Sequence, residues 1–145
     1  MTNTTIANTG EKAATIFRTN TKQGNVSLVV KNCTFYNLFS GEALMRDIIG
    51  STNSFTAENI LFAGSGSVKI FNKTSDAPGI INGSKIYSSL DLTVANAGEV
   101  STTALSYSSS QLFPNASSST DVLDLTFGAD IPNEVKIIGD PRWNK

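Results

Sequence analysis

A repeat of roughly 27 residues is the feature of this sequence that most restricts its fold. The aligned pairs are Val30 with Ala57, Asn32 with Asn59, Cys33 with Ile60, Phe35 with Phe62 and Asn37 with Gly64. A weaker third copy, aligned 25 residues further on, puts Ser84 at the Asn position, Lys85 at an apolar position and Tyr87 at the Phe position. A unit of this length cannot bury its apolar face alone and does so against its neighbours. The sequence therefore predicts stacked coils that share one apolar interior.

The position of Asn32 predicts a corner in each coil. Side chains alternate between the two faces of a strand, yet Val30 and Cys33 both occupy apolar, inward positions although they are three residues apart. The alternation breaks between them, so the backbone turns there, and Asn tolerates the unusual backbone angles of a corner. Coils that stack about 4.8 Å apart bring equivalent Asn amides within hydrogen-bonding reach. We therefore expect a ladder of corner Asn side chains.

Most of the chain consists of short runs that are typical of β-strands and are separated by Gly, Asn and Ser. The expected strands are VSLVV, CTFYNLF, FTAENILF, SVKIF, GIING, KIYSSL, LDLTV, VLDLTF and EVKII. The one weak helix signal is GEALMRDII, residues 41–49, for which we expect a single helical turn or a loop. A length of 145 residues fits one domain. We divide it into a polar N-terminal segment or partial first coil (1–24), stacked coils (25–100), and a final coil with a cap (101–145).

Composition excludes several kinds of chemistry. The net charge is -1 and Lys and Arg never occur in runs, so a nucleic-acid partner is not expected. The apolar stretches are far shorter than the ~20 residues that cross a bilayer. With no His and a single Cys, we expect no metal site, no cofactor and no activated thiol, and we interpret Cys33 as a core residue. The N-terminal MTNTTIANTG lacks the regions of a signal peptide, so we expect a chain that starts after its leader.

Two segments carry a resemblance to known proteins. The runs LVVKNCTFYNL and FTAENILFAGS resemble coils of the right-handed parallel β-helix, or pectate-lyase-like, superfamily, in which an Asn bend precedes an inward aromatic residue. The terminal Gly-Asp-Pro-Arg-Trp, residues 139–143, is similar to the ending of a family of uncharacterised gut-bacterial surface proteins that are commonly encoded with polysaccharide-uptake systems. The resemblance implies an all-β fold, a short right-handed single-stranded parallel β-helix with a C-terminal cap, and an extracellular or cell-surface protein with a glycan-related role. It transfers no catalytic residue.

Acidic residues are the only candidates for catalysis on such a fold. A polysaccharide lyase needs clustered carboxylates for Ca²⁺ with a Lys or Arg base, and a glycoside hydrolase needs two converging carboxyl groups. The residues that we considered are Asp121, Asp124 and Asp130 for a lyase and Asp47, Glu58 and Asp91 for a hydrolase. We interpret all six as surface charges, with Glu58 paired to Lys31 one coil away, and we assign no catalytic residue.

Sugar binding usually requires an aromatic platform surrounded by amide and hydroxyl groups. The candidates are Tyr36, Tyr87, Tyr107 and Trp143. Tyr36 is outward by alternation and is the preferred candidate, whereas Tyr87 is predicted to be buried. We interpret Trp143, with Arg142 beside it, mainly as a cap over the open end of the coils, because Pro141 cannot continue a central strand. The second interpretation of Trp143 and Arg142 is a contact with a ligand.

These observations leave three hypotheses about function. The first is a non-catalytic surface module associated with polysaccharide binding or uptake, through Tyr36, Arg142 and Trp143. The second is a β-helix lyase or hydrolase that acts on uronate-type glycans. The third is a structural segment of a larger surface protein.

Overall fold

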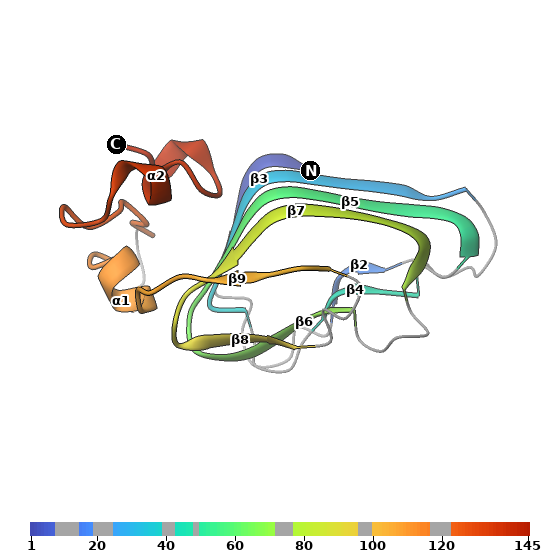
Figure 1. The fold of residues 1–145 in the computed structure, drawn as a ribbon, viewed down its shortest axis with the longest axis horizontal. Helices are drawn as coiled ribbons and strands as arrows, with labels where there is room; N and C mark the ends of the chain where they lie inside the picture. The colour runs from blue at the N-terminus through green and yellow to red at the C-terminus, as the bar shows by residue number, and fades with distance from the viewer. Residues whose placement is uncertain are drawn as a thin grey trace.

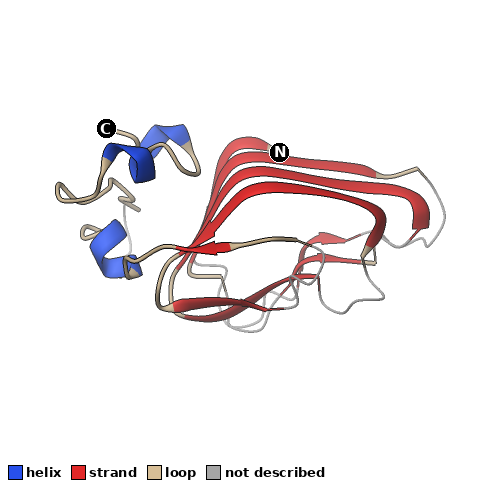
Figure 2. Cartoon of the chain, in the orientation of Figure 1, coloured by secondary structure: helices blue, strands red, loops and turns tan. Residues whose placement is uncertain are grey.

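Two parallel β-sheets form the body of the computed structural model, which describes residues 1–7, 15–18, 25–38, 43–47, 50–71, 77–95, 100–116 and 123–145 (Figures 1 and 2). The first sheet contains, in order, β1 (Thr2–Ala7), β3 (Ser27–Tyr36), β5 (Gly50–Ala63), β7 (Pro78–Ser88) and β9 (Thr103–Ala104). The second sheet contains β2 (Thr15–Arg18), β4 (Ala43–Arg46), β6 (Gly66–Phe71) and β8 (Leu92–Ala95). The chain alternates between the sheets, and every strand pairs in parallel with the strand two places later. The all-β expectation is confirmed.

The register of β3 on β5 confirms the repeat that was found in the sequence. Val30 lies opposite Ala57, Cys33 opposite Ile60, and Phe35 opposite Phe62. The inward side chains of both sheets form one core, in which the rings of Phe35 and Phe62 stack with centroids 5.1 Å apart and an interplanar angle of 19°. Cys33 belongs to this core and is fully buried, as predicted.

The corner at Asn32 is also confirmed. Asn3, Asn32 and Asn59 have φ values of 50°, 50° and 54°, in the left-handed region, at the place where the long strands of the first sheet bend (Figure 1). The Nδ2 of Asn59 donates to the Oδ1 of Asn32 at 3.1 Å, and the Nδ2 of Asn32 donates to the Oδ1 of Asn3 at 3.1 Å. The amide ladder therefore holds three strands at their bends, and its first member, Asn3, was not identified from the sequence.

The third copy of the repeat was aligned one residue out of register. In β7, Ser84 lies opposite Glu58 and Ile86 opposite Ile60, so Lys85 occupies the corner position of Asn59. Lys85 has the left-handed φ of 52° that the corner requires. The separation between paired residues is 29 for β1 and β3, 27 for β3 and β5, and 26 along most of β5 and β7, because the connections outside the first sheet differ in length. A fixed period could not locate this corner.

Replacing Lys85 with Asn is expected to raise the free energy of unfolding by about 1 kcal/mol. A Lys at positive φ carries a steric cost of roughly 1–2 kcal/mol, and Asn lowers that cost because its short polar side chain bonds locally. Urea unfolding followed by circular dichroism measures the change. Lys69→Asn on β6, at a residue that is not among those with positive φ, is the matched control and should give no gain. Equal stabilities for Lys85→Asn and the parent chain would contradict the interpretation of the corner.

Three local expectations were wrong. Residues 43–46 form the strand β4 rather than a helical turn, because pairing with β2 and β6 outweighs the helix propensity of Leu, Met and Arg. The run EVKII falls in α2 (Asn133–Lys136), and the described part of VLDLTF, residues 123–127, contains no strand. Both runs lie outside the repeat, so no neighbouring coil is available to pair with them.

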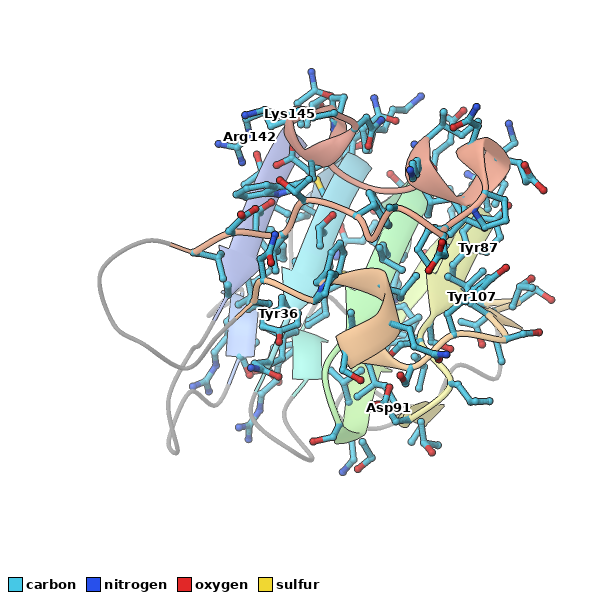
Figure 3. The ribbon with its side chains drawn as sticks, turned by 90° about the vertical axis from the view of Figure 1, so that its left-hand side faces the viewer. Tyr36, Tyr87, Asp91, Tyr107, Arg142 and Lys145 are labelled. Carbon is cyan, nitrogen blue, oxygen red and sulfur yellow. The ribbon has the colours of Figure 1, made fainter. Side chains whose placement is uncertain are left out.

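The C-terminal segment, residues 105–116 and 123–145, covers the outer face of the first sheet rather than the end of the stack (Figure 3). It contains α1 (Ser109–Leu112), α2 and the 3₁₀ helix η2 (Pro141–Trp143). Phe113, Phe127 and Ile138 pack with Leu61 and Tyr36, whose side chains point away from the inner core. The segment thus creates a second core and corrects the expectation of an end cap.

Candidate functional site

Two pockets flank α1, where the C-terminal segment meets the turns that leave the first sheet. Ser110 and Pro114 line both of them. We call the pair the α1 groove, and we call its two parts the Tyr107 pocket and the Asp91 pocket. In Figure 3, α1 lies between Tyr36 and Tyr107, and Asp91 lies below it.

The Tyr107 pocket has a volume of about 300 Å³. Its lining residues are Tyr107, Ser110, Gln111, Pro114, Gly128, Ala129, Asp130 and Ile131. Tyr107 is half-buried and supplies an aromatic ring, while Gln111 and Asp130 are exposed and supply an amide and a carboxylate. An aromatic surface with a few polar groups around it is the usual composition of a small-ligand site.

The Asp91 pocket has a volume of about 240 Å³. Its lining residues are Tyr36, Asn37, Gly64, Ser65, Asp91, Ser109, Ser110, Phe113, Pro114 and Ala116. Asn37 and Gly64 have positive φ, at 49° and 120°, so the turns that leave β3 and β5 carry the chain away from the outer face here. The pocket lies in the angle between these turns and α1.

The N-terminus of α1 is fixed by a capping box. The backbone N–H of Gln111 donates to the Oγ of Ser108, and the backbone N–H of Ser108 donates to the Oε1 of Gln111 at 2.8 Å. This reciprocal pair of bonds is the usual device that closes the first turn of a helix. The spacing Ser108-x-x-Gln111 is visible in the sequence and is a signal that could have located α1.

A hydrogen-bond network attaches α1 to the strand turns. The Oγ of Ser109 accepts from the backbone N–H of Gly64 at 2.6 Å and lies 2.8 Å from the Oγ of Ser89. The Oδ1 of Asp91 accepts from the backbone N–H and the Oγ of Ser109, both at 2.9 Å. Ser89 and Ser109 are buried. The floor of the Asp91 pocket is consequently rigid.

The carboxyl group of Asp91 is ionised at neutral pH. Partial burial alone would raise its pKa, but the hydrogen bonds from Ser109 outweigh that effect and hold the pKa below its usual range. The Asp91 pocket therefore carries a fixed negative charge.

Tyr36 lies on the outward side of β3, as alternation predicts, but it is not an exposed platform. Only 9% of the residue is exposed, and its ring packs edge-on against Phe113 with centroids 5.9 Å apart. Burial raises the pKa of its phenol. Tyr36 contributes one wall of the Asp91 pocket, and the expectation that it stands free in solvent is wrong because the C-terminal segment covers it.

Arg142 and Trp143 lie outside the α1 groove and join the C-terminal segment to β1. The Nε1 of Trp143 donates to the Oγ1 of Thr5 at 2.7 Å. Arg142 forms an ion pair with Asp140, whose side chain is fully buried and also accepts from the Oγ1 of Thr5 at 2.8 Å. Burial alone would raise the pKa of Asp140, but its bonds to Arg142 and Thr5 lower it below the usual range.

The acidic candidates for catalysis are dispersed. Asp47 pairs with Arg18 at 2.9 Å, and Glu58 pairs with Lys31 at 2.7 Å, as expected for the latter. Asp124 accepts from the backbone N–H of Thr126 at 2.8 Å. Asp121 lies outside the described residues. Across the described ranges, no three His, Cys, Asp or Glu residues gather as they would around a metal ion.

A third hollow of about 320 Å³ lies over β5 and β7. Its lining residues are Thr56, Ala57, Glu58, Ile81, Asn82, Gly83 and Ser84, which include no aromatic side chain. It lacks the stacking surface that the Tyr107 pocket offers, so the α1 groove is the stronger candidate.

Comparison with known proteins adds no functional residue. No protein-family model matches this chain, and no curated protein or solved structure shows significant similarity to it. Within the described part of the chain, no helix has the length and apolar character to span a bilayer. What is shown is a chain built mainly of parallel β-sheets, with a groove beside α1.

Proposed function

We propose that this chain is a non-catalytic polysaccharide-binding module of the bacterial cell surface, built as a right-handed parallel β-helix, and that the α1 groove binds the glycan. The resemblance of the Asn-bend runs and of the terminal pentapeptide supports the assignment of fold and location. The alternating strand order and the Asn ladder are compatible with it.

The observation that carries the proposal is the combination of Tyr107, Gln111 and Asp130 in one pocket. Sugar rings present apolar C–H faces that stack on aromatic rings and hydroxyl groups that bond to amides and carboxylates. The pocket volume of about 300 Å³ lies at the lower end of the range of roughly 300–1,000 Å³ for small-ligand sites. The Tyr107 pocket therefore suits a single sugar ring, and the smaller Asp91 pocket beside it offers further polar contacts to the same polymer.

The groove favours binding over bond cleavage. A general acid needs a pKa near the working pH, and the lowered pKa of Asp91 makes it a poor proton donor. The Oδ1 of Asp91 is also committed to two hydrogen bonds from Ser109. These facts support a binding module over the hydrolase alternative.

Replacing Ser110 with Trp should reduce polymer binding at least about tenfold, because Ser110 lines both pockets and a bulky ring there fills the groove. Ser110 is exposed, so the substitution leaves both cores intact. Affinity gel electrophoresis with galactomannan, xyloglucan, pullulan and methyl-esterified homogalacturonan measures retention. Ser101→Trp, at an exposed serine that lines none of the three hollows described above, is the matched control.

Retention of a polymer by the parent chain and Ser101→Trp, with loss in Ser110→Trp, would support the α1 groove as the site. Equal retention by both variants would place binding elsewhere. A folded parent chain that is retained by none of the polymers would contradict the binding role. That outcome would favour the structural-segment hypothesis. Within the described sheets, β1 and β2 each pair with only one neighbouring strand, and the unpaired outer edge of each strand supports that hypothesis.

A further inference from the structure

We propose that the α1 groove selects uncharged glycans and rejects glycans that carry uronate groups. This inference rests on the proposed binding role, and it concerns the class of polymer that the groove accepts. It opposes the second hypothesis from the sequence, a lyase or hydrolase that acts on uronate-type glycans.

Each pocket of the groove contains one carboxylate. Asp91 lines one pocket and Asp130 lines the other, and no Lys or Arg is among the described residues that line either. Because the two pockets share Ser110 and Pro114, a glycan that occupies both would contact both acids. A uronate ring in either pocket would place two like charges close together without a cation to compensate.

Asp91 cannot move away from such a ligand. Its Oδ1 is held by the backbone and side chain of Ser109, and Ser109 is tied in turn to Gly64 and Ser89. A fixed carboxylate is well suited to accept hydrogen bonds from sugar hydroxyl groups, and it repels an anionic ring for the same reason.

Several described cations are already paired outside the groove. Arg18 pairs with Asp47, Lys31 with Glu58, and Arg142 with Asp140. Figure 3 shows Arg142 and Lys145 at the upper edge of this face, whereas Asp91 lies at its lower edge. The groove therefore faces its ligand with net negative charge.

The test compares each polymer of the panel above with its own acidic form. Galactomannan, xyloglucan and pullulan are used before and after oxidation of their primary hydroxyls to carboxylates, and homogalacturonan is used with and without its methyl esters. Affinity gels are run at low and at high ionic strength. We expect the acidic form to be retained at least about tenfold less strongly than the uncharged form at low ionic strength, with a smaller difference at high ionic strength because salt screens exposed charges.

Removing the carboxylates of the α1 groove should weaken its discrimination between uncharged and acidic polymers. Asp130→Asn and Asp91→Asn keep the shape and an acceptor oxygen, so each variant should regain part of the retention of the acidic polymer, and the double variant should regain more. Glu134→Gln removes one charge from the exposed surface of α2, outside the groove. It should leave the ratio between the retention of the acidic form and that of the uncharged form unchanged.

The two proposals fail in different ways. If the acidic polymers are retained as well as the uncharged ones, or better, and Ser110→Trp abolishes that retention, the groove binds glycans and the proposed selectivity is wrong. An unchanged ratio in both Asn variants would also overturn the selectivity. If no polymer is retained in either form, the binding role and the selectivity are both contradicted.

Discussion

Phe62→Ala is expected to lower the free energy of unfolding by about 3–5 kcal/mol, the usual cost of truncating a fully buried Phe. Phe62 is 1% exposed and stacks on Phe35, which is 0% exposed. The substitution leaves a cavity in the middle of the inner core, where strands on both sides are fixed by their ladders and cannot collapse into the space. Urea unfolding monitored by circular dichroism measures the loss.

Two further variants make this prediction specific. Phe62→Leu retains most of the volume and should cost less than half as much as Phe62→Ala. Val29→Ala on β3, where the side chain is 38% exposed, should change the stability only slightly. A loss below about 1.5 kcal/mol for Phe62→Ala would mean that Phe35 and Phe62 do not pack in a rigid core.

Asp140→Ala is expected to cost about 2–3 kcal/mol, because hydrogen bonds to a charged group are among the stronger ones in proteins. Asp140, whose carboxylate is fully buried, joins the C-terminal segment to two strands. It accepts from Thr5 of β1 at 2.8 Å, and its own backbone N–H donates to the Oγ1 of Thr34 of β3 at 2.9 Å. The Ala variant keeps the backbone bond but loses the bonds from Thr5 and Arg142.

The same group gives a pH dependence with a definite sign. The folded-state pKa of Asp140 lies below its ordinary value, so the native chain binds this proton less readily than the unfolded chain does. Its contribution to stability is complete above the unfolded pKa of about 3.9 and is lost as the pH falls from there through the folded pKa. The free energy of unfolding of Asp140→Ala should therefore approach that of the parent chain as the pH is lowered through that range.

Stability curves of both chains from neutral to acidic pH measure this difference. Glu134→Gln serves as a control, because it removes one carboxylate from the exposed surface of α2. A deficit of Asp140→Ala that stays constant down to the lowest pH would show that the ionised carboxylate does not hold the C-terminal segment in place.

The inner core could be predicted because its information is local and repeated. Equivalent inward positions of β3 and β5 recur at a constant spacing, so aligning Asn32 with Asn59 was enough to pair Phe35 with Phe62 and to locate the bend. The method failed at β7: the third copy was aligned with a spacing of 25 residues, whereas the register gives 26, so Ser84 was placed at the corner that Lys85 occupies. Connections outside the first sheet can change length without disturbing the core, and a sequence period does not detect that.

The candidate site was less accessible to sequence reasoning. Tyr107, Asp91 and Asp130 were each considered separately, but nothing in their positions indicated that they lie along one groove. Gln111 and Ser109 were not identified, although the capping box Ser108-x-x-Gln111 was a usable signal for α1. Tyr36 was placed on the correct side of its strand, and its burial depends on a segment that begins about 70 residues later.

The sequence by itself predicted the equivalence of β3 and β5, the corners at Asn32 and Asn59, and the packing of Phe35 with Phe62 in the inner core, because side-chain alternation and a regular repeat translate directly into strand register. Only the tertiary structure decided where the C-terminal segment lies. That segment has no repeat and is held by packing on Leu61, by the hydrogen bond that Thr5 donates to the carboxylate of Asp140, and by the one that Thr34 accepts from the backbone N–H of Asp140. These are contacts between residues far apart in the chain. The α1 groove exists because of that placement.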